Sequence, residues 1–362
     1  MNSSELDFLR TEAAAILKAQ PGQQVSLTPL AGGGNNRVYR VELEGRVFLL
    51  KRYFRHPEDR RDRLHHEWSW LSFAAQHRLD CVPQPVAADR ERGLALYSFV
   101  PGRRPQPEEV GLDLLNQAIA LHLGMNAHRD EPAAERIPIA SEAAFSFEEH
   151  MRMCEVRMVR LNAIPAVTET DQACSDFLRK TLLPLWARVK DHLPGEVARC
   201  RFSMQEPLAR KDCCLSPSDF GFHNSLLDDQ GHVVFVDFEY AGWDDPAKLV
   251  CEFFYHPAFP LPLDHHRHFQ KETLQIFDDP SMHAARCSLL QPVYQLKWCT
   301  IILNPFLPRK SEPRRFARPQ EKVESAKRRR LDRARALART CEEGLQTVPP
   351  GLDHRKDQNH WR

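Results

Sequence analysis

Two aspartates and an asparagine in the second half of the chain have the types and spacing suited to phosphate chemistry. Asp219 and Asn224 stand five residues apart in the stretch SPSDFGFHNSLL, and Asp237 ends a hydrophobic run 18 residues after Asp219. Phosphoryl transfer from ATP needs a carboxylate beside the attacking hydroxyl and oxygen ligands for Mg²⁺. We expect Asp219 to orient or deprotonate an acceptor hydroxyl, and Asn224 and Asp237 to hold Mg²⁺. A D-x4-N spacing alone occurs by chance in long chains, so this hypothesis depends on partners elsewhere.

A glycine-rich loop in the N-terminal part supplies the first partner. Gly32, Gly33, Gly34 and Asn35 precede a stretch in which apolar residues alternate with polar ones. Small residues let backbone N–H groups approach phosphate oxygens closely. The loop is therefore a candidate phosphate cradle, although such a segment on its own is equally typical of a flexible connection.

A lysine and a glutamate supply the second partner. Lys51 ends the predicted strand 47–51 and can place a positive charge near the α- and β-phosphates. Glu67 lies 16 residues further on, within a predicted amphipathic helix, and could hold Lys51 in place. Glu58 is a second acidic candidate nearby, and taken alone both charges would be read as solvated surface groups.

Together these motifs resemble the aminoglycoside phosphotransferase/choline kinase family of small-molecule kinases. The resemblance rests on GGGNNRVYRV, FLLKRY, the HEWSWL helix, SDFGFHNSLL and VFVDFEYAGWDDP, and it spans roughly residues 25–260. It implies ATP and Mg²⁺ as cofactors and a hinge, including Ser98 and Phe99, whose backbone contacts the adenine. The Asp-Phe-Glu sequence at 237–239, where protein kinases have Asp-Phe-Gly, favours the small-molecule branch.

The catalytic loop departs from the family pattern at one position. The family's loop usually begins His-Gly-Asp, whereas Pro217 stands here at the histidine position. Proline could supply rigidity through its fixed φ, and His223 could help to anchor the loop. The departure leaves an alternative open, namely a catalytically weak or inactive nucleotide-binding regulator.

The order of predicted elements indicates an α+β protein with a two-lobed, protein-kinase-like fold. A helix over the first 20 residues is followed by a hairpin with a turn at Glu44-Gly45, a helix over 58–77 and a strand near 93–100. Helical periodicity then dominates, interrupted by one β-hairpin over 224–240. We expect a β-rich N-lobe at 1–101, a mainly helical C-lobe at 102–345 and a disordered tail at 346–362.

Composition excludes several classes of protein. The 362 residues are 42% hydrophobic and 27% charged, with a formal net charge of +1, so neither wholesale disorder nor a globally basic nucleic-acid binder is indicated. The ten cysteines lack zinc-site spacing and are typical of reduced thiols. No apolar run approaches the roughly 18 residues of a membrane span, and we expect a cytoplasmic protein.

The charge is unevenly distributed. Residues 309–339 contain 13 Lys and Arg against four Asp and Glu, and 309–340 is predicted to be a basic helix with a thin apolar stripe. We expect this helix to dock on the acidic remainder of the chain, and no nucleic-acid partner is expected. Binding to RNA phosphates, membrane headgroups or another acidic partner is the alternative.

The phosphate acceptor is expected to be a hydroxyl of a small molecule, of the aminoglycoside, choline-like or sugar class. An amine-bearing acceptor would need acidic or aromatic side chains. Those available are Glu148, Glu149, Glu155, Trp243, Asp244 and Trp298.

Overall fold

The chain folds into two compact units. The computed structural model describes residues 3–30, 36–56, 59, 61–165, 167–257, 259, 261–308 and 320–347. Unit 1 comprises Met1–Ala144 and Leu208–Ala284, and unit 2 comprises Phe145–Pro207 and Ala285–Arg362. The predicted glycine-rich loop and tail lie outside the described residues, apart from the last two helical positions at 346–347.

Unit 1 begins with an antiparallel sheet whose five strands follow the order β1-β2-β3-β5-β4. The strands are β1 (Val25–Pro29), β2 (Arg37–Leu43), β3 (Arg46–Arg52), β4 (Pro85–Asp89) and β5 (Leu94–Ser98). The β2–β3 hairpin turns at Glu44 and Gly45, whose φ angles are 49° and 74°. Two successive positive φ values match the twist of a two-residue hairpin, so the predicted turn is confirmed.

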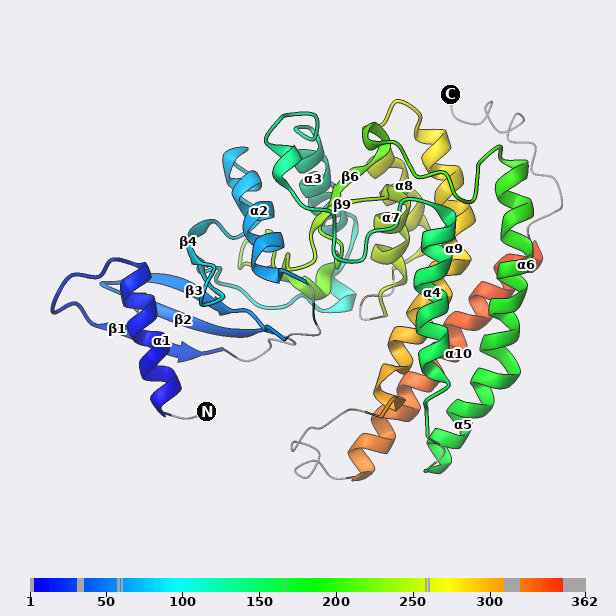
Figure 1. The fold of residues 1–362 in the computed structure, drawn as a ribbon, viewed down its shortest axis with the longest axis horizontal. Helices are drawn as coiled ribbons and strands as arrows, with labels where there is room; N and C mark the ends of the chain where they lie inside the picture. The colour runs from blue at the N-terminus through cyan, green and yellow to red at the C-terminus, as the bar shows by residue number, and fades with distance from the viewer. Residues whose placement is uncertain are drawn as a thin grey trace. The chain divides into compact units, whose positions relative to one another are not determined.

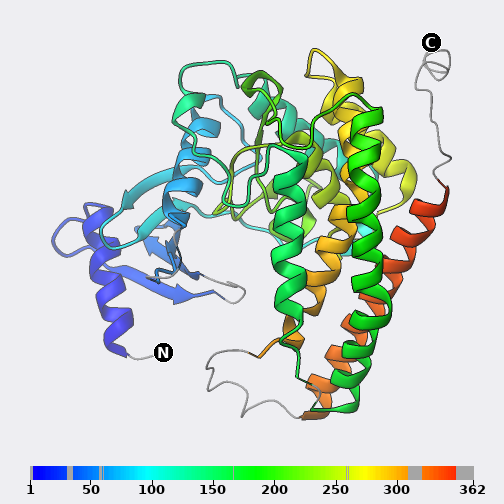
Figure 2. The same cartoon turned by 45° about the vertical axis from the view of Figure 1, so that its right-hand side comes forward.

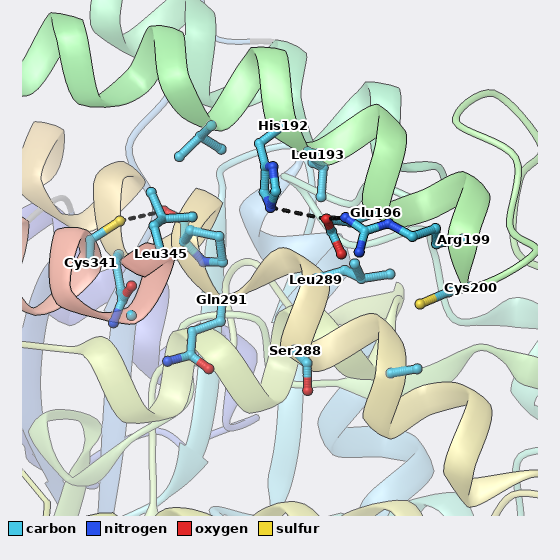
Figure 3. Close-up of a pocket in the computed structure, with 15 residues that line it drawn as sticks. His192, Leu193, Glu196, Arg199, Cys200, Ser288, Leu289, Gln291, Cys341 and Leu345 are labelled. Carbon is cyan, nitrogen blue, oxygen red and sulfur yellow. Dashed lines mark hydrogen bonds and ion pairs between the residues drawn. The ribbon is translucent and has the colours of Figure 1, made fainter. Parts of the chain in front are cut away.

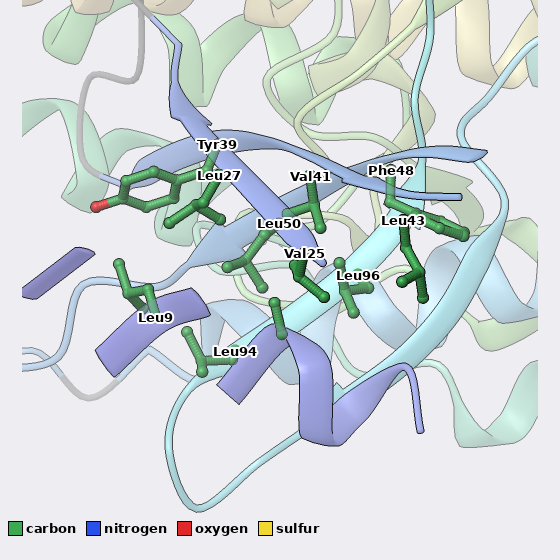
Figure 4. Packing of buried hydrophobic residues seen from close by; sticks show 11 residues of the cluster. Leu9, Val25, Leu27, Tyr39, Val41, Leu43, Phe48, Leu50, Leu94 and Leu96 are labelled. Carbon is green, nitrogen blue, oxygen red and sulfur yellow. The ribbon is translucent and has the colours of Figure 1, made fainter. Parts of the chain in front are cut away.

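One helix covers each face of this sheet (Figure 1). On one face, α1 (Ser3–Ile16) buries Leu9 and Ala13 against alternate strand residues such as Val41 and Leu50, as Figure 4 shows. Because successive strand residues point to opposite faces, Lys51 lies on the other face, where it contacts α2 (Arg63–Gln76). The apolar core on the first face thus fixes the strand that carries Lys51.

Both of these helices are shorter than the periodicity predicts. α1 stops at Ile16 instead of residue 20, because Lys18 adopts a left-handed conformation, with φ of 53°, and the chain closes with backbone hydrogen bonds typical of a helix C-terminus. α2 starts at Arg63 instead of residue 58, because the side chain of Asp62 accepts the backbone N–H of His65 and caps the helix. Helix capping therefore sets the C-terminus of α1 and the N-terminus of α2.

The rest of unit 1 brings short strands and helices together. They are α3 (Leu112–Asn126), β6 (Cys214–Ser216), β7 (Ser225–Leu227), β8 (Val233–Phe235), β9 (Gly242–Asp244), α7 (Pro246–Tyr255) and α8 (Leu263–Leu274). The pairing of β7 with β8 confirms the predicted hairpin, while the pairing of β6 with β9 was not predicted. The turn sequence between β7 and β8 signals their hairpin, whereas β6 and β9 lie far apart in the chain and three residues each carry too little periodicity to signal their pairing.

Unit 2 is helical. It contains α4 (Phe147–Leu161), α5 (Glu169–Phe177), a π-helical turn (Leu178–Leu182), α6 (Leu183–Arg199), most of α9 (Pro280–Leu303) and α10 (Gln320–Thr347). Figure 2 shows α4, α6 and α9 running alongside one another. His150 of α4 hydrogen-bonds to the Tyr294 hydroxyl of α9 at 2.6 Å, and Arg188 of α6 pairs with Glu342 of α10 at 2.9 Å.

The basic helix α10 docks within unit 2. Leu331, Ala334, Ala338 and Cys341 form its buried stripe. Lys327, itself nearly buried, places its ammonium 2.7 Å from the Asp171 carboxylate of α5. The predicted self-docking is therefore observed for the described part of the segment, while residues 309–319 lie outside it.

Truncation of the buried stripe is expected to destabilise unit 2. A Leu331→Ala variant should lower the free energy of unfolding by about 2–4 kcal/mol, because a fully buried leucine leaves a cavity. The exposed neighbour Arg329 provides the control, and Arg329→Ala should change stability by at most about 0.5 kcal/mol. Urea unfolding followed by circular dichroism measures both, and equal effects would contradict the docking of α10.

The arrangement of a sheet in the N-terminal region and helices in the C-terminal region confirms the predicted α+β class. The lobe boundary at residue 101 stays a prediction, because the two compact units divide the chain at other places. Among the described helices, none combines the length and apolarity required to cross a membrane.

Candidate functional site

The centre of the candidate site is a buried lysine between two carboxylates. Lys51 Nζ lies 2.6 Å from Glu67 Oε2 and 2.5 Å from Asp237 Oδ1. Burial works to lower the pKa of Lys51, but the charges of Glu67 and Asp237 outweigh it and raise the pKa above its ordinary value. Lys51 therefore keeps its positive charge, and the structure brings together three residues that the sequence placed far apart.

Two tyrosines hold Glu67 in position. The Tyr53 hydroxyl donates to Glu67 Oε2 at 2.6 Å and lies 2.7 Å from the Tyr97 hydroxyl. The Phe238 backbone N–H approaches Glu67 Oε1 at 3.3 Å. Sequence analysis missed Tyr53, although its position two residues beyond Lys51 places both on one face of an extended chain.

The catalytic-loop residues also meet. Asn224 Nδ2 donates to the Asp219 backbone carbonyl at 3.0 Å and to Asp219 Oδ2 at 3.2 Å. His223 Nε2 lies 3.2 Å from Asp219 Oδ1, and its ring stacks on His256 with centroids 3.7 Å apart. Burial works to raise the pKa of Asp219, yet the hydrogen bond from His223 and that from Asn224 hold it below its usual range.

The β7–β8 hairpin brings the two predicted metal ligands to one end. Ser225 pairs with Phe235, and the Val236 N–H donates to the Asn224 carbonyl at 2.9 Å, so Asn224 lies beside the residue that precedes Asp237. The Asn224 amide nitrogen is engaged by Asp219, which leaves its Oδ1 as the donor atom for a cation. Together with the half-exposed Asp237 carboxylate, this is an all-oxygen set that fits Mg²⁺.

Glu239, two residues after Asp237, holds Asn36, which is the first described residue beyond the glycine-rich loop. Glu239 is buried and accepts hydrogen bonds from Arg63, at 2.6 Å, and from the Asn36 amide. Asn36 Oδ1 in turn accepts the Phe54 N–H at 3.0 Å. This network explains the glutamate of the Asp-Phe-Glu sequence, which sequence analysis left without a role.

A second buried network supports the catalytic loop where Pro217 replaces the family's histidine. Ser218 adopts a left-handed φ of 66°, and its hydroxyl lies 3.1 Å from Lys248 Nζ. Lys248 also forms a buried ion pair with Asp244. Burial raises the pKa of Asp244 to about 6, against the opposing charge of Lys248. The four-residue spacing of Asp244 and Lys248 is the only sequence signal for this pair.

The structure describes the two predicted adenine-contacting residues but not the predicted phosphate cradle. Ser98 ends β5, and both its N–H and its hydroxyl are engaged by the Gln84 backbone. Phe99 follows, with the Arg40 guanidinium 5.6 Å from its ring centroid. The predicted cradle residues Gly32–Asn35 lie outside the described residues, as does Glu58.

Several predicted acceptor-binding residues already have structural partners. Glu149 closes a capping box at the start of α4, Glu155 pairs with Lys190, and Asp244 pairs with Lys248. The Trp243 indole N–H donates to the Ala134 carbonyl at 3.0 Å. These contacts give each of the four side chains a structural role that does not require a bound acceptor.

Unit 2 contains a pocket of about 250 Å³ that includes none of the predicted site residues (Figure 3). Its walls come from α6, α9 and α10 and are mainly apolar, with Leu193, Leu289 and Leu345 among them. At its edge, His192 and Arg199 both point toward Glu196, as Figure 3 shows. The pocket therefore shares no residue with the lysine–carboxylate cluster, and the two lie in different compact units.

Several solved structures with a similar fold are small-molecule kinases. Choline kinase from Cryptosporidium parvum Iowa II has a TM-score of 0.56 at 12% identity, covering 98% of this chain and 99% of that one. A choline/ethanolamine kinase family protein from Mesorhizobium loti has a TM-score of 0.55 at 18% identity, covering 94% and 99%. An amicoumacin kinase in complex with AMP-PNP, Ca²⁺ and its ligand has a TM-score of 0.53 at 18% identity, covering 98% and 100%.

These likenesses confirm the predicted protein-kinase-like fold. Among curated protein sequences, none is significantly similar to this chain. The family model described as "Phosphotransferase enzyme family" matches residues 26–248, which is more than half of the chain and spans every predicted site residue. The chain therefore belongs to the phosphotransferase enzyme family and is a small-molecule kinase, as its motifs predict.

Proposed function

We propose that the protein transfers the γ-phosphate of ATP, in the presence of Mg²⁺, to a hydroxyl of a small molecule. The observation that carries the proposal is that Asn224, which contacts Asp219, also accepts a backbone hydrogen bond from Val236, the residue before Asp237, and that the Asp237 carboxylate contacts Lys51. A candidate base, two candidate oxygen ligands and a buried cation therefore lie along one connected path. The alternative, a nucleotide-binding regulator without transfer activity, would not require Asp219 to be aligned in this way.

Asp219 would act on the acceptor. Its carboxylate orients the hydroxyl and accepts the proton as the acceptor oxygen forms a bond to the γ-phosphorus, while the bond from that phosphorus to the ADP oxygen breaks. The hydrogen bonds from Asn224 and His223 keep the carboxylate in one orientation and favour its ionised form. Positioning, more than covalent chemistry, is what the chain contributes.

Lys51 would contact the nucleotide phosphates from its ion pair with Glu67. Asn224 and Asp237 would hold Mg²⁺ by oxygen atoms, and the cation when bound would neutralise phosphate charge. The complex of the amicoumacin kinase with AMP-PNP and Ca²⁺ supports this use of nucleotide and divalent cation for the fold. Gly32–Asn35 would cradle the phosphates, and the backbone after Ser98 would meet the adenine.

The acceptor class is inferred from the solved kinases that share the fold. Choline, ethanolamine and aminoglycoside kinases share the fold, so amino alcohols and amine-bearing sugars are the first candidates. We also propose a cytoplasmic location, where ATP is available.

Asp237→Ala is expected to abolish the contribution of Mg²⁺ to ATP binding. The variant loses one of two oxygen ligands and a partner of Lys51, so MgATP affinity should fall on the order of 10–100-fold. Calorimetric titration of ATP with Mg²⁺ and with EDTA measures the difference. Asp229→Ala, at an exposed position in the turn of the same hairpin, is the control and should bind as the wild type does. An undiminished Mg²⁺ effect in Asp237→Ala would remove Asp237 from the metal site.

A turnover assay distinguishes the proposed kinase from a nucleotide-binding regulator without transfer activity. The purified protein is incubated with MgATP and a panel of amino alcohols, aminoglycosides and sugars, and ADP release is measured for each. Acceptor-dependent ADP release that Asp219→Asn abolishes would support transfer. Stabilisation by MgATP without transfer to any acceptor would favour the regulator that Pro217 leaves open.

A further inference from the structure

Two histidines and a glutamate gather where the end of α2 meets the turns after α3. His77 caps the C-terminus of α2, and its backbone N–H donates to carbonyls of the last helical turn. His128 and Glu131 lie one turn after α3, and the Glu131 N–H donates to the His128 carbonyl at 3.1 Å. The three side chains lie together in unit 1, outside the lysine–carboxylate cluster.

The donor atoms of the three side chains converge. The imidazole rings of His77 and His128 stack with centroids 3.8 Å apart and planes inclined by 16°. Glu131 Oε1 lies 2.7 Å from His128 Nδ1, and Glu131 Oε2 lies 3.5 Å from His77 Nε2. One potential ligand atom from each residue lies within 4.8 Å of the other two. Tetrahedral zinc with bonds of about 2.0–2.2 Å holds ligand atoms roughly 3.3 Å apart, so the stacked imidazole rings would rotate about their side-chain bonds for both nitrogens to face one ion.

His77 presents a buried nitrogen that its described surroundings do not satisfy. Its side chain is 9% exposed, and Nε2 makes no hydrogen bond to any described residue. A buried polar atom without a partner is costly, and a metal ion at this position would supply one.

We propose that His77, His128 and Glu131 bind a Zn²⁺ ion, with water completing a tetrahedral site. Two imidazoles and one carboxylate suit Zn²⁺, whereas the Mg²⁺ proposed for the phosphate site prefers oxygen ligands alone. The ion would join the C-terminal end of α2 to the turn after α3. Because α2 also carries Glu67, zinc would restrain the helix that holds Lys51. The site goes beyond the proposed kinase reaction and does not depend on it.

Zinc titration of the full-length protein tests the site without any catalytic readout. Isothermal calorimetry in the absence of nucleotide should detect one Zn²⁺ per chain, and thermal unfolding should shift upward with zinc. Co²⁺ in its place should give the visible absorption of a tetrahedral site. His128→Ala and His77→Ala should each weaken zinc binding on the order of 100-fold, since loss of even an outer-shell partner costs 10–100-fold.

A matched histidine and a rival cluster supply the controls. His232 lies 3.1 Å from Asp228 as a surface pair with no third ligand among the described residues, and His232→Ala should bind zinc as the wild type does. Asp219, His223 and His256 also bring three ligand atoms within 4.8 Å of one another. His128 is partly exposed, so His128→Ala should fold normally even if His77→Ala does not. Absence of zinc binding, or binding lost in His256→Ala but kept in His128→Ala, would overturn the proposal.

Discussion

Asp219→Asn is expected to bind MgATP as the wild type does and to transfer phosphate about 10²–10⁴-fold more slowly. The amide keeps the size of the side chain but cannot accept the acceptor's proton. Nucleotide affinity should persist, because the groups proposed to contact phosphate and cation, Lys51, Asn224 and Asp237, are unchanged. Single-turnover ADP formation at saturating acceptor measures the chemical step, and calorimetry measures nucleotide affinity.

The control for this variant is Asp229→Asn in the exposed hairpin turn, where the same change of charge should leave turnover intact. The two measurements also separate failure of chemistry from failure of folding, because a misfolded protein would lose nucleotide binding as well. Undiminished transfer by Asp219→Asn would remove Asp219 from its proposed role.

Lys248→Met is expected to destabilise unit 1 more than any single surface change. The ammonium is 1% exposed and lies between the Asp244 carboxylate and the Ser218 hydroxyl. Its removal leaves Asp244 buried without its cation, which typically costs about 3–5 kcal/mol. Urea unfolding should report this loss, and turnover should fall as well, because Ser218 directly precedes Asp219.

A double variant distinguishes the broken ion pair from simple loss of packing. Lys248→Met combined with Asp244→Asn removes both charges, so it should be less destabilised than Lys248→Met alone. Lys271→Met tests an exposed lysine 3.8 Å from Glu272, and it should change stability by about 0–1 kcal/mol. If the double variant were the least stable of the three, the buried charge would not be the cause.

Local patterns predicted the elements that carry the site. Alternation placed Lys51 at the end of a strand, helical periodicity placed Glu67 on a helix, and turn residues placed Asp237 after a hairpin. These signals span a few residues each, and the family resemblance joined them into one site. The structure then brought Lys51, Glu67 and Asp237 within hydrogen-bond distance.

The buried polar networks could not be predicted in the same way. The contact of Asn36 with Glu239 joins residues 203 positions apart, and that of Arg63 with Glu239 joins residues 176 apart. Nothing in the spacing of one sequence pairs them, because burial decides which polar groups must find partners. The sequence also predicted the end of α1 and the start of α2 at other positions than the observed Ile16 and Arg63. The reason is related, because a single residue at a helix end outweighs the periodicity around it.

Ser218 and Asp237 share a left-handed backbone that side chains other than glycine rarely adopt, with φ of 66° and 69°. Each such residue costs on the order of 1–2 kcal/mol, which glycine would relieve. Glycine would also delete the hydroxyl that meets Lys248 and the carboxylate that meets Lys51. Because these two side chains contact the buried ammonium groups of Lys248 and Lys51, the backbone strain is retained together with the groups that the proposed phosphate-transfer site uses.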